Sequence, residues 1–202
     1  MHGREHKGQG VSYSQYDEEK YILECCPDEG SFLDIGAWDG KTFSNTLALA
    51  ERGWGGILVE PSPESFIALL KLHGGNPRMT LIHAAVGFER CMVRLWNSAD
   101  AVSTTQEASY EAWKAHAEFT GSFYVPMITI EDIWNQFGGA DFINIDTEGT
   151  SVDLALHLFQ TLARPRCLCI EHDGRLVELQ QAAQGAGYKT IHTNGTNVVL
   201  SL

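Results

Sequence analysis

The sequence predicts an α/β fold with a seven-stranded, mostly parallel sheet and helices on both faces. Short apolar runs alternate with helix-like segments through most of the 202 residues, which is the pattern of a doubly wound sheet. These runs are nearly continuous, as is typical of parallel strands covered on both faces. The last two runs are joined by Asn194-Gly195, a pair that favours the positive φ of a type I′ hairpin turn. The final strand should therefore be antiparallel to the one before it.

The expected elements follow one another without repeats or low-complexity linkers. Seven apolar runs are the expected strands of the main sheet: 31–35, 56–60, 79–86, 140–145, 166–171, 188–192 and 198–202. Four segments have the helical pattern: 42–52, 63–72, 151–162 and 174–185. The second of these begins with Ser62 and Pro63, residue types that favour the cap and first turn of a helix. The chain is thus expected to be one domain over residues 1–202, with a polar leader at 1–11.

The middle of the chain is less regular. Residues 91–96 and 124–129 are expected to form additional strands, with a short helix from Ile130. Between them, 97–124 is a polar insertion with Tyr110 and Trp113 at helical spacing. It is either an exposed helix whose aromatic stripe packs on the body or a lid over a substrate, and long loops in α/β folds are often functional.

Charge and cysteine content limit the function. The net charge of −12 argues against nucleic acid, because binding its phosphates needs clustered Lys and Arg. No apolar stretch is long enough to span a membrane. The five cysteines lack zinc-site spacing, and their odd number does not suit a disulfide framework. We therefore expect reduced thiols, a cytoplasmic protein and a small-molecule substrate.

The glycine turn after the first expected strand is the most informative motif. Asp34 is followed by Gly36, Ala37, Asp39 and Gly40, and the two glycines allow a ligand to approach the backbone. The spacing is not the Gly-x-Gly-x-x-Gly of dinucleotide sites, and acids repel phosphate. S-adenosylmethionine has a sulfonium, an ammonium and a ribose diol but no phosphate, so it suits this turn.

Other strand ends supply the rest of the expected site. Glu60 lies about 20 residues beyond the glycine turn, where a carboxylate accepts ribose hydroxyls, and Pro61 and Ser62 follow it. At the end of the third run, Ala85 is small enough to leave room for a flat adenine.

Three residues are candidates for the chemistry. Asp146 and Glu148 follow the fourth main strand, where they could bind the cofactor's amino group, accept a proton or hold a divalent cation. Asp146 could instead cap the next helix. His172, at the end of the fifth strand, is a candidate general base or simply an exposed histidine. We predict no metal.

These motifs resemble the FkbM-type methyltransferases that use S-adenosylmethionine. The resemblance rests on four motifs in order: Ser12–Gln15, Asp34–Thr46, Gly53–Pro63 and Ile143–Gly149. It implies a Rossmann-like class I methyltransferase fold and methyl transfer, typically to a hydroxyl of a sugar or other metabolite. It also implies that Gly36, Ala37, Asp39, Ser44 and Asn45 shape the cofactor pocket, that Glu60 holds the ribose, and that Asp146 and Glu148 face the reacting centre.

Two departures from the family pattern stand out. Thr150 and Ser151 replace an acid that often follows the Glu-Gly pair, which weakens the case for a metal, and Trp38 stands where a smaller residue is common. Two other functions stay open: a nicotinamide-dependent oxidoreductase and a nucleoside-binding module without turnover. We expect alanine at Asp34 or Glu60 to weaken cofactor binding and to leave the fold intact.

Overall fold

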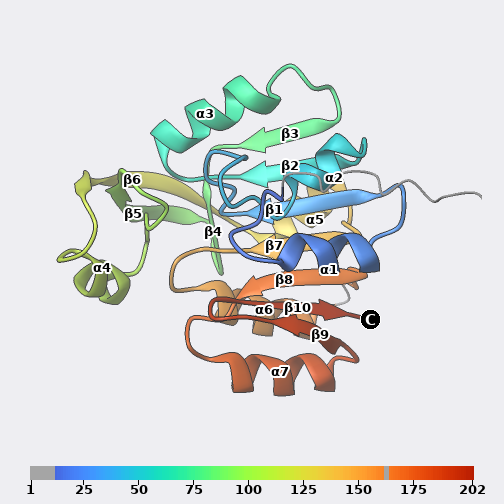
Figure 1. Cartoon of the computed structure of the whole chain (residues 1–202). Helices are drawn as coiled ribbons and strands as arrows, with labels where there is room; N and C mark the ends of the chain where they lie inside the picture. Colours follow the sequence, from blue (N-terminus) through green and yellow to red (C-terminus); the bar gives the residue numbers. More distant parts are fainter. Residues whose placement is uncertain (1–11, 162–163) are drawn as a thin grey trace, which may run out of the picture.

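The computed structural model describes residues 12–161 and 164–202. The larger of the two sheets formed by these residues has seven strands in the order β3-β2-β1-β7-β8-β10-β9 (Figure 1). Their bounds are β1 (Ser31–Ile35), β2 (Gly55–Val59), β3 (Met79–Ile82), β7 (Phe142–Ile145), β8 (Cys167–Glu171), β9 (Lys189–Thr193) and β10 (Asn197–Ser201). The pairs β1–β2, β2–β3, β1–β7 and β7–β8 are parallel, and β10 is antiparallel to both of its neighbours. The expected sheet is confirmed, whereas the expected leader at 1–11 lies outside the described residues.

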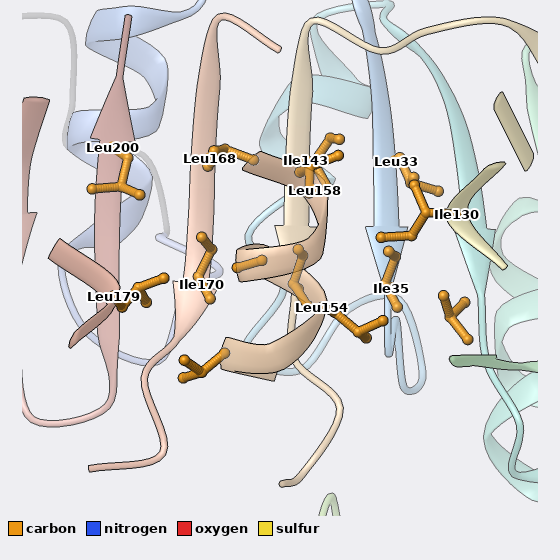
Figure 2. Packing of buried hydrophobic residues seen from close by; sticks show 14 of the residues in the cluster. Leu33, Ile35, Ile130, Ile143, Leu154, Leu158, Leu168, Ile170, Leu179 and Leu200 are labelled. Atoms are coloured by element: carbon orange, nitrogen blue, oxygen red, sulfur yellow. The ribbon is translucent and has the colours of Figure 1, made fainter. Parts of the chain in front are cut away.

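Side-chain alternation along the strands divides the core between the two faces of this sheet. One face is covered by α5 (Ile130–Phe137), α6 (Ser151–Gln160) and α7 (Leu176–Gly185), and the other by α1 (Glu18–Cys25), α2 (Leu47–Glu51) and α3 (Pro63–His73). Leu33 and Ile35 of β1 belong to the same apolar cluster as Leu154 and Leu158 of α6 (Figure 2). Phe32 points to the opposite face, so by alternation Asp34 also faces the α1–α3 side.

A second, three-stranded sheet lies beside the main one and was not expected as a separate unit. Among the described residues its order is β4-β6-β5, with β4 (Ala85–Gly87), β5 (Cys91–Ser98) and β6 (Phe119–Thr129). The expected strand 79–86 is wrong as one element, because the chain leaves β3 at Ile82 and joins the small sheet at Ala85. Figure 1 shows α4 (Glu107–Trp113) beyond the β5–β6 ribbon.

Two helices also differ from expectation. The sequence did not predict α1, and the helix expected at 42–52 is limited to Leu47–Glu51. Its first residues form an irregular turn in which Phe43 has a φ of 56°. The Ser44 hydroxyl oxygen accepts hydrogen bonds from the backbone N–H groups of Thr46 and Leu47, at 3.2 and 3.0 Å. Because a Ser side chain satisfies free N–H groups in this way at helix starts, the helix begins only after it.

The turn between β9 and β10 is held by a side chain. The expected positive φ is wrong, since within the described chain neither Asn194 nor Gly195 has one. Instead, Asn194 Oδ1 accepts hydrogen bonds from the backbone N–H groups of Thr196 and Asn197, at 2.9 and 2.8 Å, as Asn often does in turns. The antiparallel pairing that the turn predicted is confirmed.

Cys25 at the end of α1 forms a disulfide with Cys167 at the start of β8. The expectation of reduced thiols is therefore wrong for these two residues, and the inferred reducing compartment loses this support. A pairing across 142 positions left no signal in the sequence. Cys26 and Cys169 are buried free thiols, and Cys91 is exposed. No helix within the described residues has the length and apolar character needed to cross a membrane.

Candidate active site

A cavity of about 280 Å³ opens at the carboxyl ends of the main strands. It lies around the junction of β1 and β7, where the strand order reverses, which is where ligands bind in open α/β sheets. Nine of the expected cofactor residues line it: Asp34, Gly36, Ala37, Ser44, Asn45, Glu60, Pro61, Ala85 and Asp146. Its lining also includes residues that were not among the expected cofactor or catalytic residues, namely Gln15, Asn144, Trp113 and Glu171.

The glycine turn packs directly against the neighbouring strand end. Gly36 has a φ of 82°, and a Cβ on it would lie 1.6 Å from the carbonyl oxygen of Asp146. The backbone N–H groups of Gly36 and Ala37 both donate to the carbonyl oxygen of Val59, at 3.0 and 3.1 Å. Only glycine permits this approach, so Gly36 joins the ends of β1, β2 and β7.

Three expected cofactor residues, Asp39, Gly40 and Ser62, do not line the cavity. Asp39 Oδ1 accepts hydrogen bonds from the backbone N–H groups of Lys41 and Thr42, at 2.8 and 2.7 Å, and so holds its own turn. A Cβ on Gly40 would lie 2.5 Å from Leu69 Cδ1, so Gly40 lets α3 pack against the turn. Ser62 acts through its backbone N–H.

Glu60 presents a buried carboxylate at the end of β2. Its two oxygens accept hydrogen bonds from the backbone N–H groups of Trp38 (2.9 Å) and Ser62 (2.7 Å). Burial raises the pKa of Glu60 to about 7, although these two hydrogen bonds lower it and the nearby Asp34 and Asp146 raise it further. Each oxygen retains a lone pair, so the fixed carboxylate can still accept hydroxyl groups from a ligand.

Asp34 belongs to a chain of buried hydrogen bonds. Its oxygens accept from Thr46 Oγ1 at 2.6 Å and from Asn144 Nδ2 at 2.9 Å. Asn144 Oδ1 accepts from Asn45 Nδ2 at 3.0 Å, and Asn45 Oδ1 accepts from Ser14 Oγ at 2.8 Å. Burial raises the pKa of Asp34, whereas its two hydrogen bonds lower it. Asp34 therefore links β1, β7 and the segment before α1.

Replacing Asp34 with alanine should lower the free energy of unfolding by about 2–5 kcal/mol, because Thr46 and Asn144 would lose a buried acceptor. For this variant, the structure thus adds a loss of stability to the weaker cofactor binding that was expected from the sequence. Urea denaturation followed by circular dichroism measures the loss, and Asp28→Ala, at an exposed position, is the control. Equal midpoints for the two variants would contradict the structural role of Asp34.

Acids gather where β7 and β8 end. The carboxylate oxygens of Asp146, Glu148 and Glu171 lie within 4.8 Å of one another. Burial is the main cause that raises the pKa of each, and repulsion from neighbouring carboxylates adds to it: Asp146 and Asp173 act on both Glu148 and Glu171, whereas Asp34, Asp173 and Glu18 act on Asp146. Asp146 and Glu171 also share a hydrogen bond, so a proton held between them relieves the repulsion. The cluster has the donor set of a divalent-cation site, and the absence of a metal stays a prediction.

His172 lies apart from the main cavity. It lines a neighbouring cavity of about 240 Å³ that shares Trp113, Glu148, Glu171 and Thr196 with the first. Its Nδ1 accepts from the backbone N–H of Gly174 at 3.3 Å, and its Nε2 is 3.3 Å from the carbonyl oxygen of Asn194. With both ring nitrogens engaged, His172 is placed less favourably for proton transfer than Glu148. Its neighbour in sequence, Glu171, lines the main cavity, whereas His172 does not.

Residues 101–113, named the cover segment below, contribute to the lining of the cavity through Ala101, Val102, Ser103, Thr105 and Trp113. Thr104 Oγ1 donates to the carbonyl oxygen of Glu148 at 2.7 Å. Tyr110 stacks on Trp96 of β5, with ring centroids 5.5 Å apart. The aromatic stripe of the insertion thus packs on the body, and its loop borders the cavity; the lid over a substrate stays a prediction.

Gly149 sets how closely the cover segment approaches Glu148. Its φ is 117°, and a Cβ there would lie 2.3 Å from Ser109 Oγ of α4. We expect Gly149→Ala to displace α4, which hydrogen–deuterium exchange should detect as faster exchange over residues 104–113. Gly187→Ala is the matched control, because Gly187 also has a positive φ (94°) but no atom within 4 Å of its Cβ position. Unchanged exchange in Gly149→Ala would contradict this contact.

The family model described as the methyltransferase FkbM domain matches residues 34–153, well over half of the chain. The chain belongs to the FkbM methyltransferase family. This confirms the resemblance stated from the sequence, and with it S-adenosylmethionine as the cofactor of this methyltransferase. The matched region contains the glycine turn, Glu60 and the Asp146–Glu148 pair. No curated protein matches the chain.

The chain is similar to several solved methyltransferase structures, of which the first below has a TM-score above 0.5 and shares its fold. Precorrin-6y C5,15-methyltransferase from Geobacter metallireducens has a TM-score of 0.52 at 10% identity, with 92% of this chain and 85% of that chain covered. The ribosomal protein L11 methylase from Lactobacillus delbrueckii has a TM-score of 0.48 at 15% identity, with 91% and 75% covered. Fibrillarin from Aeropyrum pernix, solved with natively bound S-adenosyl-L-methionine, has a TM-score of 0.47 at 10% identity, with 91% and 73% covered.

Proposed function

We propose that this methyltransferase transfers the methyl group of S-adenosylmethionine to a hydroxyl oxygen of a sugar or another small metabolite. The observation that carries the proposal is the fixed, buried Glu60 carboxylate, which faces the same cavity as the carboxylates that end β7 and β8. A carboxylate that can bind the ribose hydroxyls of the cofactor and a carboxylate that can accept the proton of the substrate hydroxyl thus border the same cavity. Methyl transfer to oxygen needs both functions close together.

The residues present fit S-adenosylmethionine. Glu60 would accept the ribose hydroxyls, and Ala84 and Ala85 leave space beside them for the adenine. Asp146 would accept the ammonium of the amino-acid portion. The cavity, at about 280 Å³, is slightly smaller than the range of about 300–1,000 Å³ that is typical of small-molecule sites.

The cofactor supplies an electrophilic methyl group, and the protein has to orient the acceptor and remove its proton. Glu148 is the best placed base, because it lines both cavities and burial raises its pKa. A carboxylate whose pKa lies nearer to neutrality is a stronger base toward a hydroxyl. The cover segment would exclude water during the transfer.

Two other functions were considered from the sequence. The FkbM family match disfavours the nicotinamide-dependent oxidoreductase. A binding module without turnover would keep the cavity, but it would have no need for a base at Glu148. A nucleic-acid acceptor is disfavoured by the net charge of −12 and by the absence of Lys and Arg among the described residues that line the cavity.

The function can be tested by incubating the full chain with methyl-labelled S-adenosylmethionine and a panel of sugars, other hydroxyl compounds, amines and RNA. Mass spectrometry would then measure S-adenosylhomocysteine and the methylated product. Product formed from a hydroxyl compound is the expected result. Product formed only from an amine or RNA would contradict the proposed acceptor, and failure to bind the cofactor at all would contradict the proposed function.

A further inference from the structure

The segment that leads into α1 crosses the carboxyl edge of the main sheet and is anchored at both ends. At one end, Ser14 Oγ donates to Asn45 Oδ1 at 2.8 Å, and its backbone forms a bridge with Phe43. At the other end, the fully buried Glu18 accepts hydrogen bonds from Asn194 Nδ2 (2.7 Å) and Asn197 Nδ2 (2.8 Å). The backbone between these anchors is therefore fixed over the cavity.

Gln15 lies between the two anchors and lines the cavity. Its neighbour Ser14 is buried, whereas the Gln15 side chain is exposed. Within the described part of the chain, no hydrogen bond engages the Gln15 amide. A fixed backbone thus holds a residue with an unengaged side-chain amide at the edge of the ligand space.

The charges around the cavity indicate which ligand group the Gln15 amide would bind. Five carboxylates line it, those of Asp34, Glu60, Asp146, Glu148 and Glu171, and no Lys or Arg does among the described residues. These acids suit the ammonium and the ribose of S-adenosylmethionine. They repel its carboxylate, which therefore needs a neutral hydrogen-bond donor.

The other amides at the cavity are already engaged as donors. Asn45 Nδ2 donates to Asn144 Oδ1, and Asn144 Nδ2 donates to Asp34. Asn197 Nδ2 donates to Glu18. Of the four side-chain amides among the described residues that line the cavity, Gln15 alone keeps both of its N–H donors available.

We propose that Gln15 binds the carboxylate of the amino-acid portion of S-adenosylmethionine through its side-chain amide. The inference rests on the proposed function and assigns a ligand contact that the sequence did not predict. Gln15 is then a cofactor-specificity residue, which distinguishes ligands that carry the amino acid from simple nucleosides.

Calorimetry on the full chain can test this with two ligands. S-adenosylhomocysteine contains the carboxylate, and 5′-methylthioadenosine lacks the amino-acid portion. We expect Gln15→Ala to weaken S-adenosylhomocysteine binding about 10- to 100-fold, the effect of losing one hydrogen bond to a charged group. The affinity for 5′-methylthioadenosine should not change. Gln15→Glu should weaken S-adenosylhomocysteine binding further, because it adds a negative charge.

Gln136→Ala is the matched control, because Gln136 is exposed on α5 and does not line the cavity. Circular dichroism would verify that each variant is folded. If Gln15→Ala binds S-adenosylhomocysteine as tightly as the wild type, or loses affinity for both ligands equally, the inference is overturned and the proposed function stands. If the wild type binds neither ligand, the proposed function itself fails.

Discussion

Glu148→Gln should lower kcat by about 10²- to 10⁴-fold, the usual contribution of a general base, and should leave the affinity for S-adenosylhomocysteine nearly unchanged. The glutamine preserves the size of the side chain but cannot accept the proton of the acceptor hydroxyl. The measurement is steady-state product formation with the acceptor found in the panel, together with calorimetry for the cofactor product.

The pH profile gives this prediction a second readout. Burial, with the nearby Asp146 and Asp173, raises the pKa of Glu148. The deprotonated carboxylate, which is the form that acts as a base, therefore becomes populated only as the pH rises through that raised value. We therefore expect kcat of the wild type to increase with pH over this range and kcat of Glu148→Gln to lack the increase. Glu29→Gln, at an exposed position before β1, is the control. A variant with wild-type kcat would exclude Glu148 as the base.

Glu60→Ala should weaken cofactor binding by at least about 100-fold, because two hydroxyl groups would lose a charged acceptor worth roughly 1.5–3 kcal/mol each. Calorimetry with adenosine and with 2′,3′-dideoxyadenosine, which lacks both hydroxyl groups, separates the loss of these hydrogen bonds from a general distortion of the cavity. The wild type should prefer adenosine, whereas Glu60→Ala should bind the two nucleosides equally. The exposed Glu89 provides the control variant, Glu89→Ala. Continued preference for adenosine in Glu60→Ala would show that the hydroxyl groups bind elsewhere.

Glu60 also makes stability depend on pH. Its pKa of about 7 in the folded protein exceeds the value of about 4.3 expected for an unfolded chain, so the folded state binds the proton more tightly. The free energy of unfolding should therefore fall as the pH rises from about 4.3 to 7, by at most about 3 kcal/mol from this group. A bound diol would offset this cost by donating hydrogen bonds to the carboxylate.

The parts of the fold that the sequence predicted were those with local signals. The apolar runs that form β1 and β2, the helix that begins at Pro63 and the antiparallel final strand all left a pattern in neighbouring residues. The division of 79–86 between two sheets left none, because Ile82 and Ala85 are equally compatible with one continuous strand. Helix α1 was not predicted because its apolar stripe is weak and is interrupted by charged residues. Ile22 is the only apolar side chain of this helix that is fully buried.

The candidate site shows the same limit. Residues that end strands, such as Glu60 and Asp146, could be placed at the cavity because parallel strands end at a common edge. Glu171 obeys the same rule and lines the cavity, whereas the adjacent His172, the residue type more typical of a general base, does not. Gln15 could not be placed, since its position depends on Ser14 and Glu18 contacting distant parts of the chain.

The tie between Glu18 and the β9–β10 turn has a consequence for biosynthesis. The ribosome completes β1, α2 and β2 long before it makes Asn194 and Asn197, the two partners of Glu18. A nascent chain therefore holds most of the cofactor-facing residues while its first helix still lacks a docking surface. Binding competence should arise only when the last hairpin leaves the exit tunnel, so a truncated product lacking β10 would not retain the methyl donor.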